Sequence, residues 1–130
     1  MCGVKGFLWV GLGGAVGSMA RHALTSCMTD PTRRGFPYGT LCVNLIGSFL
    51  LGMLAHLALT TGRMSPALHA GLTAGVLGGF TTYSAFNQET LTRIEQGAWS
   101  LAAINVAATL CGCLCAGLAG QALGRALVGA

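Results

Sequence analysis

The residues Gly78-Gly-Phe-Thr-Thr-Tyr-Ser-Ala-Phe86 lie in the middle of an apolar segment and decide the fold. A Gly-Gly pair followed by a run of hydroxyl residues makes a poor continuous helix, because glycine in a helix interior costs about 1 kcal/mol relative to alanine. Within a membrane, a helix is interrupted only where the freed backbone groups line a polar site. The stretch therefore predicts a membrane helix that is broken near its middle and carries a polar site there.

The composition around this stretch is that of an integral membrane protein. Of 130 residues, 53% are hydrophobic and only 8% are charged, and the mean hydropathy is +0.68. Soluble domains carry about 25% charged residues. The net charge of +4 is scattered, with no Lys/Arg run longer than Arg33-Arg34, so we expect a lipid bilayer and no nucleic acid as the partner.

Working outward from the broken segment, charged and proline-containing stretches divide the chain into four apolar segments. These cover about residues 4–24, 38–59, 67–92 and 98–123. Each has the roughly 20 residues that cross about 30 Å of hydrocarbon as a helix. The boundaries are a connector over residues 30–37, a helix start at Ser65-Pro66 and a turn at residues 95–97. We predict one all-α membrane domain of four transmembrane helices over residues 1–130, with the first segment retained and not cleaved as a signal peptide.

The basic residues are divided almost evenly between the two ends of such a bundle. One end carries Lys5, Arg63 and Arg125; the other carries Arg33, Arg34 and Arg93, with Arg21 at the membrane edge. The positive-inside rule therefore gives almost no preferred orientation. Two alternatives stay open: another feature fixes one orientation, or the chain inserts both ways and forms an antiparallel, dual-topology homodimer.

Small residues recur at four-residue spacing on three of the segments. The ladders are Gly13 and Gly17; Gly71, Gly75 and Gly79; and Ala108, Gly112, Ala116, Gly120 and Gly124. Such spacing lets membrane helices approach closely. It predicts tight helix packing, either within one chain or between chains.

The cysteines do not indicate a metal site. In the series Cys111, Cys113, Cys115, each cysteine is turned by roughly 200° from the one before it on a helix, so the three cannot converge on one ion. We interpret them as small apolar residues.

Three segments each carry a stripe of neutral hydrogen-bonding or aromatic side chains at membrane depth. The candidate site residues are Asn44 and Ser48; Thr82, Tyr83, Ser84 and Phe86; and Asn105 and Thr109. The one intramembrane carboxylate, Glu89, has Arg93 four residues later as a possible partner. Without a Gly-x-Ser-x-Gly motif, a carboxylate pair or a nucleotide-binding loop, we expect neither an enzyme nor an ATP-driven pump. A proton-coupled small multidrug-type exporter, which would need a carboxylate in the first helix, and a non-transporting membrane assembly factor remain alternatives.

Three stretches together resemble the CrcB/Fluc family of microbial fluoride channels. They are Gly13-Gly-Ala-Val-Gly-Ser-Met-Ala-Arg21, Pro37-Tyr-Gly-Thr-Leu-Cys-Val-Asn-Leu-Ile-Gly-Ser48 and the Gly78–Phe86 stretch. The resemblance implies a fluoride-specific channel that exports cytoplasmic fluoride passively down its gradient and so relieves fluoride toxicity. It also implies a multi-pass protein of the cell inner membrane, two pores in an antiparallel homodimer, and a central structural Na⁺ that is not transported.

The resemblance also assigns roles to particular residues. It implies that Asn44 faces the pore and that Tyr83, where phenylalanine is more common, edges the fluoride path together with Phe86. The backbone carbonyls of Gly78 and Thr81 would hold the Na⁺. Asn105 stands where the family usually has tyrosine, and Arg21 and Glu89 would serve at the mouth or in structural roles. From the residues themselves, neutral donors such as the Asn44 amide can replace the water around fluoride without binding it too tightly for conduction.

Overall fold

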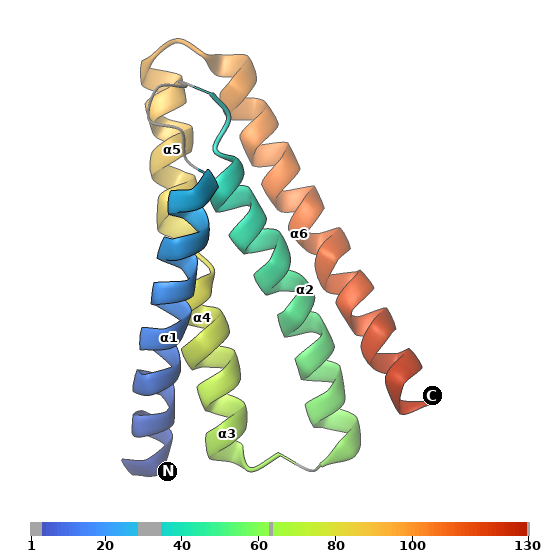
Figure 1. Cartoon of the computed structure of the whole chain (residues 1–130). Helices are drawn as coiled ribbons and strands as arrows, with labels where there is room; N and C mark the ends of the chain where they lie inside the picture. The colour runs from blue at the N-terminus through green and yellow to red at the C-terminus, as the bar shows by residue number, and fades with distance from the viewer. Residues whose placement is uncertain (1–3, 29–34, 63, 130) are drawn as a thin grey trace.

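A computed structural model of the chain describes residues 4–28, 35–62 and 64–129, and it is helical in four antiparallel rods (Figure 1). The elements are α1 (Val4–Met28), α2 (Tyr38–Thr61), α3 (Pro66–Ala70), the π-helix η1 (Gly71–Leu77), α4 (Gly78–Phe80), α5 (Tyr83–Glu95) and α6 (Trp99–Val128). The third rod consists of α3, η1, α4 and α5 in succession. The predicted all-α fold is confirmed for the described residues, none of which is in a strand.

The third rod is broken where the sequence predicts it. The rod begins at Ser65, whose side chain accepts a hydrogen bond from the Leu68 N–H at 3.3 Å, and Pro66 follows as the first helical residue. Thr81 and Thr82 then have extended backbone angles, with ψ of 157° and 113°, so that α4 ends and α5 begins across these two residues. The π-helical turn before the break was not anticipated from the sequence.

Two helices are longer than predicted. α1 continues past Leu24 to Met28 because the Thr25 hydroxyl donates to the Arg21 and His22 carbonyls at 2.9 and 3.1 Å, which keeps a polar turn helical. α6 continues to Val128 and ends at Gly129, whose φ of 76° only glycine adopts readily.

The rods pack as two close pairs, α1 against η1 and α4, and α2 against α6. A Cβ on Gly17 would clash with the Val76 carbonyl oxygen, and one on Gly79 would lie 2.6 Å from the Gly14 carbonyl oxygen. In the other pair, a Cβ on Gly120 would clash with the Phe49 carbonyl oxygen. The small-residue ladders therefore do mark tight packing, and the structure shows that these contacts form within one chain.

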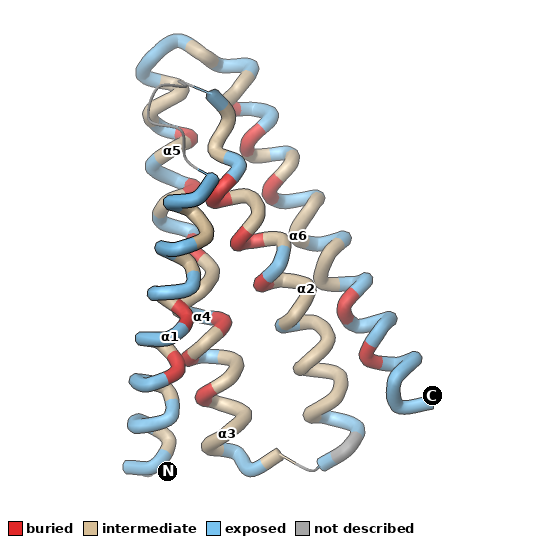
Figure 2. Tube along the Cα trace, in the orientation of Figure 1, coloured by how far each residue is buried: buried red, intermediate tan, exposed pale blue. Residues whose placement is uncertain are grey.

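Burial is inverted relative to a soluble protein (Figure 2). The buried polar residues of the described chain, Thr40, Asn44, Thr82, Thr90, Asn105 and Thr109, outnumber its buried hydrophobic residues, Val43, Leu77, Phe86 and Ala102. Large apolar side chains such as Leu8, Leu114 and Leu118 are more than 60% exposed. Two helices, residues 38–60 and 99–128, are long and apolar enough to cross a membrane, and only 17% of each apolar window is buried. An apolar surface of this extent is that of a membrane protein.

Both described ends of the chain lie at one end of the bundle, and the α5–α6 turn lies at the other (Figure 1). The predicted turn at residues 95–97 is confirmed: Gly97 has a φ of 73°, and the Ala98 N–H donates to the Arg93 carbonyl at 2.8 Å. The predictions for residues 30–34 of the connector and for Arg63 fall outside the described residues.

Candidate functional site

The break in the third rod is held by Asn44 of α2. Its Oδ1 accepts a hydrogen bond from the Thr82 N–H at 2.8 Å, and its Nδ2 donates to the Thr82 carbonyl at 3.1 Å. Asn44 is buried. The Asn44 side chain therefore replaces the helical acceptor that the Thr82 N–H loses at the break, a group that would be costly to leave unpaired in a membrane, and adds a donor to the Thr82 carbonyl.

This exchange frees particular carbonyl oxygens at the end of α4. In a continuous helix, the Gly78 carbonyl would accept from the Thr82 N–H, but that N–H donates to Asn44. The Thr81 carbonyl would likewise accept from the Ala85 N–H, which instead donates to the Thr82 hydroxyl at 3.2 Å. The resemblance implies the Gly78 and Thr81 carbonyls as cation ligands, and at the end of α4 neither receives its helical donor.

The break also begins a new helix, α5, with an N-terminus inside the bundle. Thr82 is its N-cap, and the Thr82 hydroxyl lies 3.1 Å from the Ser84 hydroxyl. Helix N-termini carry partial positive charge and attract anions, whereas C-termini, here that of α4, attract cations. The break therefore presents groups for either sign of charge.

A groove of about 290 Å³ runs along the break. It is lined by Asn44, Gly47, Ser48 and Leu51 of α2; by Thr73, Leu77, Gly78, Thr81, Thr82, Tyr83 and Phe86 of the third rod; and by Thr109, Leu110 and Cys113 of α6. Six of the eight predicted pore residues are among them, as are both predicted cation ligands. The exceptions are Ser84 and Asn105.

Two aromatic rings stand at the groove. Tyr83 and Phe86 have centroids 5.6 Å apart and planes inclined at 55°. Phe86 is buried and Tyr83 is 75% exposed. Because the two ring planes are inclined to each other, ring edges as well as ring faces are presented at the groove, and ring edges carry partial positive charge.

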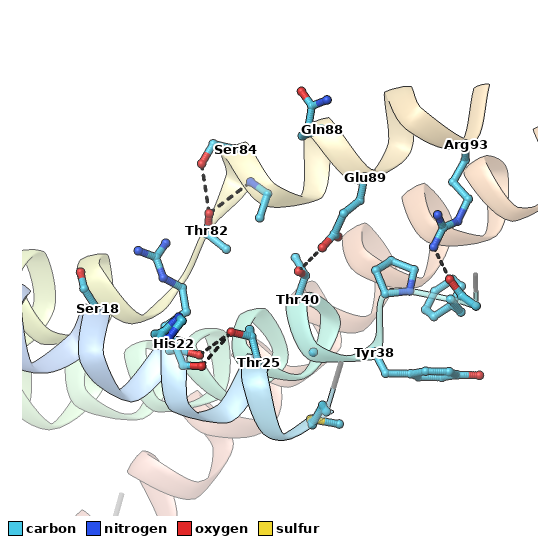
Figure 3. Close-up of a pocket in the computed structure, with 17 residues that line it drawn as sticks. Ser18, His22, Thr25, Tyr38, Thr40, Thr82, Ser84, Gln88, Glu89 and Arg93 are labelled. Atoms are coloured by element: carbon cyan, nitrogen blue, oxygen red, sulfur yellow. Dashed lines mark hydrogen bonds between the residues drawn. The ribbon is translucent and has the colours of Figure 1, made fainter. Parts of the chain in front are cut away.

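A larger cavity of about 950 Å³, which we call the vestibule, lies on the other side of the break (Figure 3). Arg21, Ser84 and Glu89 line it, and Thr82 lines both this cavity and the groove. The structure thus places the predicted mouth residues and Ser84 in one space that meets the groove at Thr82.

The charged residues of the vestibule make hydrogen bonds that the sequence did not predict. Glu89 Oε1 accepts from the Thr40 hydroxyl at 2.6 Å, and Arg93 donates to the Gly35 carbonyl (Figure 3). Both residues therefore bind the start of α2 or the residues before it, and Arg93 also acts electrostatically on Glu89, as the sequence predicts. Thr40 was not singled out from the sequence, because a threonine near a helix start gives no sign of which side chain on another helix it meets.

Asn105 lies apart from both cavities. It is 1% exposed and its Nδ2 donates to the Thr90 hydroxyl at 2.9 Å, which in turn donates to the Phe86 carbonyl at 2.8 Å. This chain of bonds ties α6 to α5 at the backbone of Phe86. Thr90 was missed from the sequence, although its position one turn after Phe86 was a signal that could have drawn attention to it.

These features define a class: a membrane protein whose interrupted helix faces a groove lined by neutral hydrogen-bonding, aromatic and aliphatic side chains. Among the described residues, no group of three or more His, Cys, Asp or Glu side chains could hold a metal ion.

Comparison with known proteins narrows the class. The family described as CrcB-like protein, Camphor Resistance (CrcB), matches residues 8–121. A relative from Sorangium cellulosum, named fluoride-specific ion channel FluC, is 48% identical over 122 residues, which cover 94% of this chain and 96% of the relative. Relatives of the same name from Magnetococcus marinus and Geobacter sulfurreducens are 42% and 46% identical, covering 90% and 88% of this chain and 95% and 92% of the relatives.

The chain belongs to the CrcB-like family, and the resemblance found in the sequence is confirmed. The relatives are named as ion channels, so the prediction that the chain is not an enzyme is confirmed by its family.

Proposed function

We propose that the chain is a fluoride-specific ion channel that exports cytoplasmic fluoride passively down its electrochemical gradient and so relieves fluoride toxicity. It would cross the cell inner membrane four times. The observation that carries the proposal is the groove of neutral hydrogen-bonding groups at the helix break, in a chain whose relatives are named fluoride-specific ion channels.

The groups around the break suit a small, strongly hydrated anion. The hydroxyls of Thr82 and Ser84 and the α5 N-terminus offer donors without a full positive charge. Asn44 uses one amide hydrogen on the Thr82 carbonyl, which leaves the other for a ligand. Several weak neutral sites let an ion enter and leave, whereas one strong charge would trap it.

The vestibule and the groove set the order in which an ion would meet the residues along the proposed path. Arg21 and Arg93 line the vestibule, where positive charge raises the local concentration of anions. An ion would then pass the Thr82–Ser84 hydroxyl pair, which lies where the cavities meet, and enter the groove beside Tyr83 and Phe86.

The freed carbonyls of Gly78 and Thr81 fit the proposed structural Na⁺, since a hard cation prefers oxygen ligands. When bound, the ion supplies positive potential beside the groove. One chain offers these two oxygens, and a second, antiparallel copy would offer the same two across a twofold axis. A cation held between two copies in this way fits the proposed homodimer with two pores.

The charges of the described residues are compatible with dual topology. Lys5 and Arg125 belong to the end of the bundle that holds the termini, and Arg93 belongs to the opposite end (Figure 1). Neither end has a clear excess of basic residues that would fix one orientation.

Fluoride efflux from reconstituted vesicles, followed with a fluoride electrode, separates the candidate functions. We expect fast release once valinomycin allows potassium to compensate the charge, with no requirement for a proton gradient. Proton-dependent exchange of a drug would indicate a multidrug-type exporter, and no flux of either kind would indicate an assembly factor. Family membership favours neither of these alternatives.

A further inference from the structure

Gly47 of α2 lies against Thr81, the first of the two extended residues at the break. A Cβ on Gly47 would overlap the Thr81 Cγ2 and would lie 3.5 Å from Cδ1 of the Phe80 ring. Gly47 is buried and lines the groove. The missing side chain at Gly47 therefore makes room for the methyl group of Thr81.

The Thr81 side chain is not free to turn away from Gly47. Its hydroxyl donates to the Leu77 carbonyl at 3.0 Å, and its N–H donates to the same carbonyl at 2.9 Å. The methyl and hydroxyl groups of a threonine share one Cβ, so a rotation that moves the methyl group also carries the hydroxyl away from its acceptor. A side chain at Gly47 would therefore displace the Thr81 backbone or cost this hydrogen bond.

The contact between Gly47 and Thr81 lies beside the bonds that Asn44 makes at the break. Asn44 precedes Gly47 by three residues, so the two lie on the same side of α2. Asn44 bonds the N–H and the carbonyl of Thr82 at 2.8 and 3.1 Å, and Gly47 receives the side chain of the preceding Thr81. One side of α2 therefore contacts both extended residues of the break.

We propose that Gly47 is a positioning residue for conduction: its missing side chain lets α2 approach Thr81 closely enough for Asn44 to bond Thr82. Displacement of Thr81 would carry Thr82, its covalent neighbour, away from the Asn44 amide, and a hydrogen bond stretched beyond about 3.5 Å is lost. Thr82 lines both the vestibule and the groove. The effect on fluoride flux rests on the proposed function, whereas the effect on the bonds between Asn44 and Thr82 does not.

The first test measures fluoride efflux from vesicles. Efflux should fall by about tenfold or more in Gly47→Ala, because overpacking at this contact shifts the backbone at the break. Thr81→Ser removes the methyl group that meets the added Cβ and keeps the hydroxyl that donates to Leu77. The double variant Gly47→Ala/Thr81→Ser conserves the total volume and should recover efflux to within about threefold of the unmodified rate.

Gly52→Ala is the matched control on the same helix. Its added Cβ would overlap the carbonyl oxygen of Gly117 on α6, so it overpacks α2 away from the break. Gly52→Ala should reduce efflux less than Gly47→Ala does. Thr81→Ser should not rescue it, because changes at sites that share no contact are additive. Equal rescue of both glycine variants, or unchanged efflux in Gly47→Ala, would overturn the proposal and leave the channel standing.

Hydrogen exchange of the Thr82 amide, followed by NMR in detergent micelles, reports on its bond to Asn44 independently of flux. The amide should exchange at least about tenfold faster in Gly47→Ala than in the unmodified protein, and Thr81→Ser should reverse the change. Lost efflux with unchanged exchange would overturn the proposal, since the added methyl group would then only obstruct the groove.

Two further outcomes keep the test decisive. Faster exchange that Thr81→Ser reverses, in a protein that carries no fluoride in any form, would support the role of Gly47 at the break and count against the proposed channel. If Gly47→Ala does not fold, recovery of folded protein in the double variant would support the proposal, and failure of the double variant to fold would overturn it.

Discussion

The two helix pairs of this bundle are packed by the same device but differ in what they carry. The α2–α6 pair joins two continuous helices whose glycines lie against the backbone of the partner, as Gly120 does against Phe49. The pair formed by α1 and the third rod has equally close glycine contacts, as at Gly17 and Val76, but its second member changes to a π-helix and then breaks.

Close glycine packing therefore occurs both between two continuous helices and between α1 and the irregular third rod. The break between α4 and α5 is satisfied across the bundle, by Asn44 of the continuous helix α2. The α2–α6 pair thus supplies Asn44, which we call the clamp. The pair formed by α1 and the third rod supplies the freed carbonyls and the helix N-terminus that face the groove.

Replacing the clamp should have the largest effect. Asn44→Asp removes the donor to the Thr82 carbonyl and places a carboxylate against that oxygen and against the fluoride path. We expect fluoride efflux from vesicles to fall by at least about 100-fold, because an unpaired like charge in a desolvated site costs several kcal/mol.

Asn87→Asp is the matched control for Asn44→Asp. Asn87 lies on α5, one residue after Phe86, and is exposed. The same change of charge there should leave the efflux rate nearly unaltered. Substantial flux through Asn44→Asp, or an equal loss in both variants, would contradict the clamp.

The glycine contacts should be the next most sensitive feature, and equally so in both pairs. Gly17→Ala and Gly120→Ala each place a methyl group on a backbone carbonyl, and overpacking of this kind costs about 1–3 kcal/mol. Thermal unfolding in detergent measures the loss. Gly14→Ala, on the same helix as Gly17 but with no atom within 4 Å of the added Cβ, should not destabilise the protein and should gain up to about 1 kcal/mol from the helix propensity of alanine. A loss of stability in only one of these two variants would contradict the claim that both helix pairs depend equally on close glycine packing.

The tie between α5 and α6 should contribute less to conduction than to stability. Asn105→Ala removes the donor to Thr90, whose hydroxyl keeps its bond to the Phe86 carbonyl. We expect a loss of about 1–3 kcal/mol in unfolding free energy and flux that is reduced but selective for fluoride over chloride. The exposed Gln121 on the same helix gives a control in Gln121→Ala, which should change neither. Lost selectivity in Asn105→Ala would place this residue in the path itself.

Tyr83→Phe should have the smallest effect. The ring and its partner Phe86 remain, and only the hydroxyl of a largely exposed side chain is removed. Since the proposed path uses the ring edge and not the hydroxyl to face the anion, we expect efflux within about twofold of the unmodified rate. A large decrease would show that the Tyr83 hydroxyl donates to the ion.

The sequence predicted the position of the break because its cause is local: Gly78-Gly79 weakens the helix and Thr82 caps the next one. It also predicted which faces carry glycine. It did not reveal that Asn44 pairs with the Thr82 backbone, that Thr40 binds Glu89, or that Asn105 turns away from the groove. These contacts join residues on different helices, and their formation depends on the relative rotation and height of packed helices, which residue spacing within one helix does not specify.

The most direct test of the central claim is the reversal potential of the current through the reconstituted protein in a planar bilayer. If the chain conducts fluoride selectively through the groove, the potential should shift by about 59 mV for each tenfold change in the fluoride gradient and should ignore a chloride gradient of the same size. A current that follows chloride or protons, or no current in a protein shown to be folded, would contradict the account.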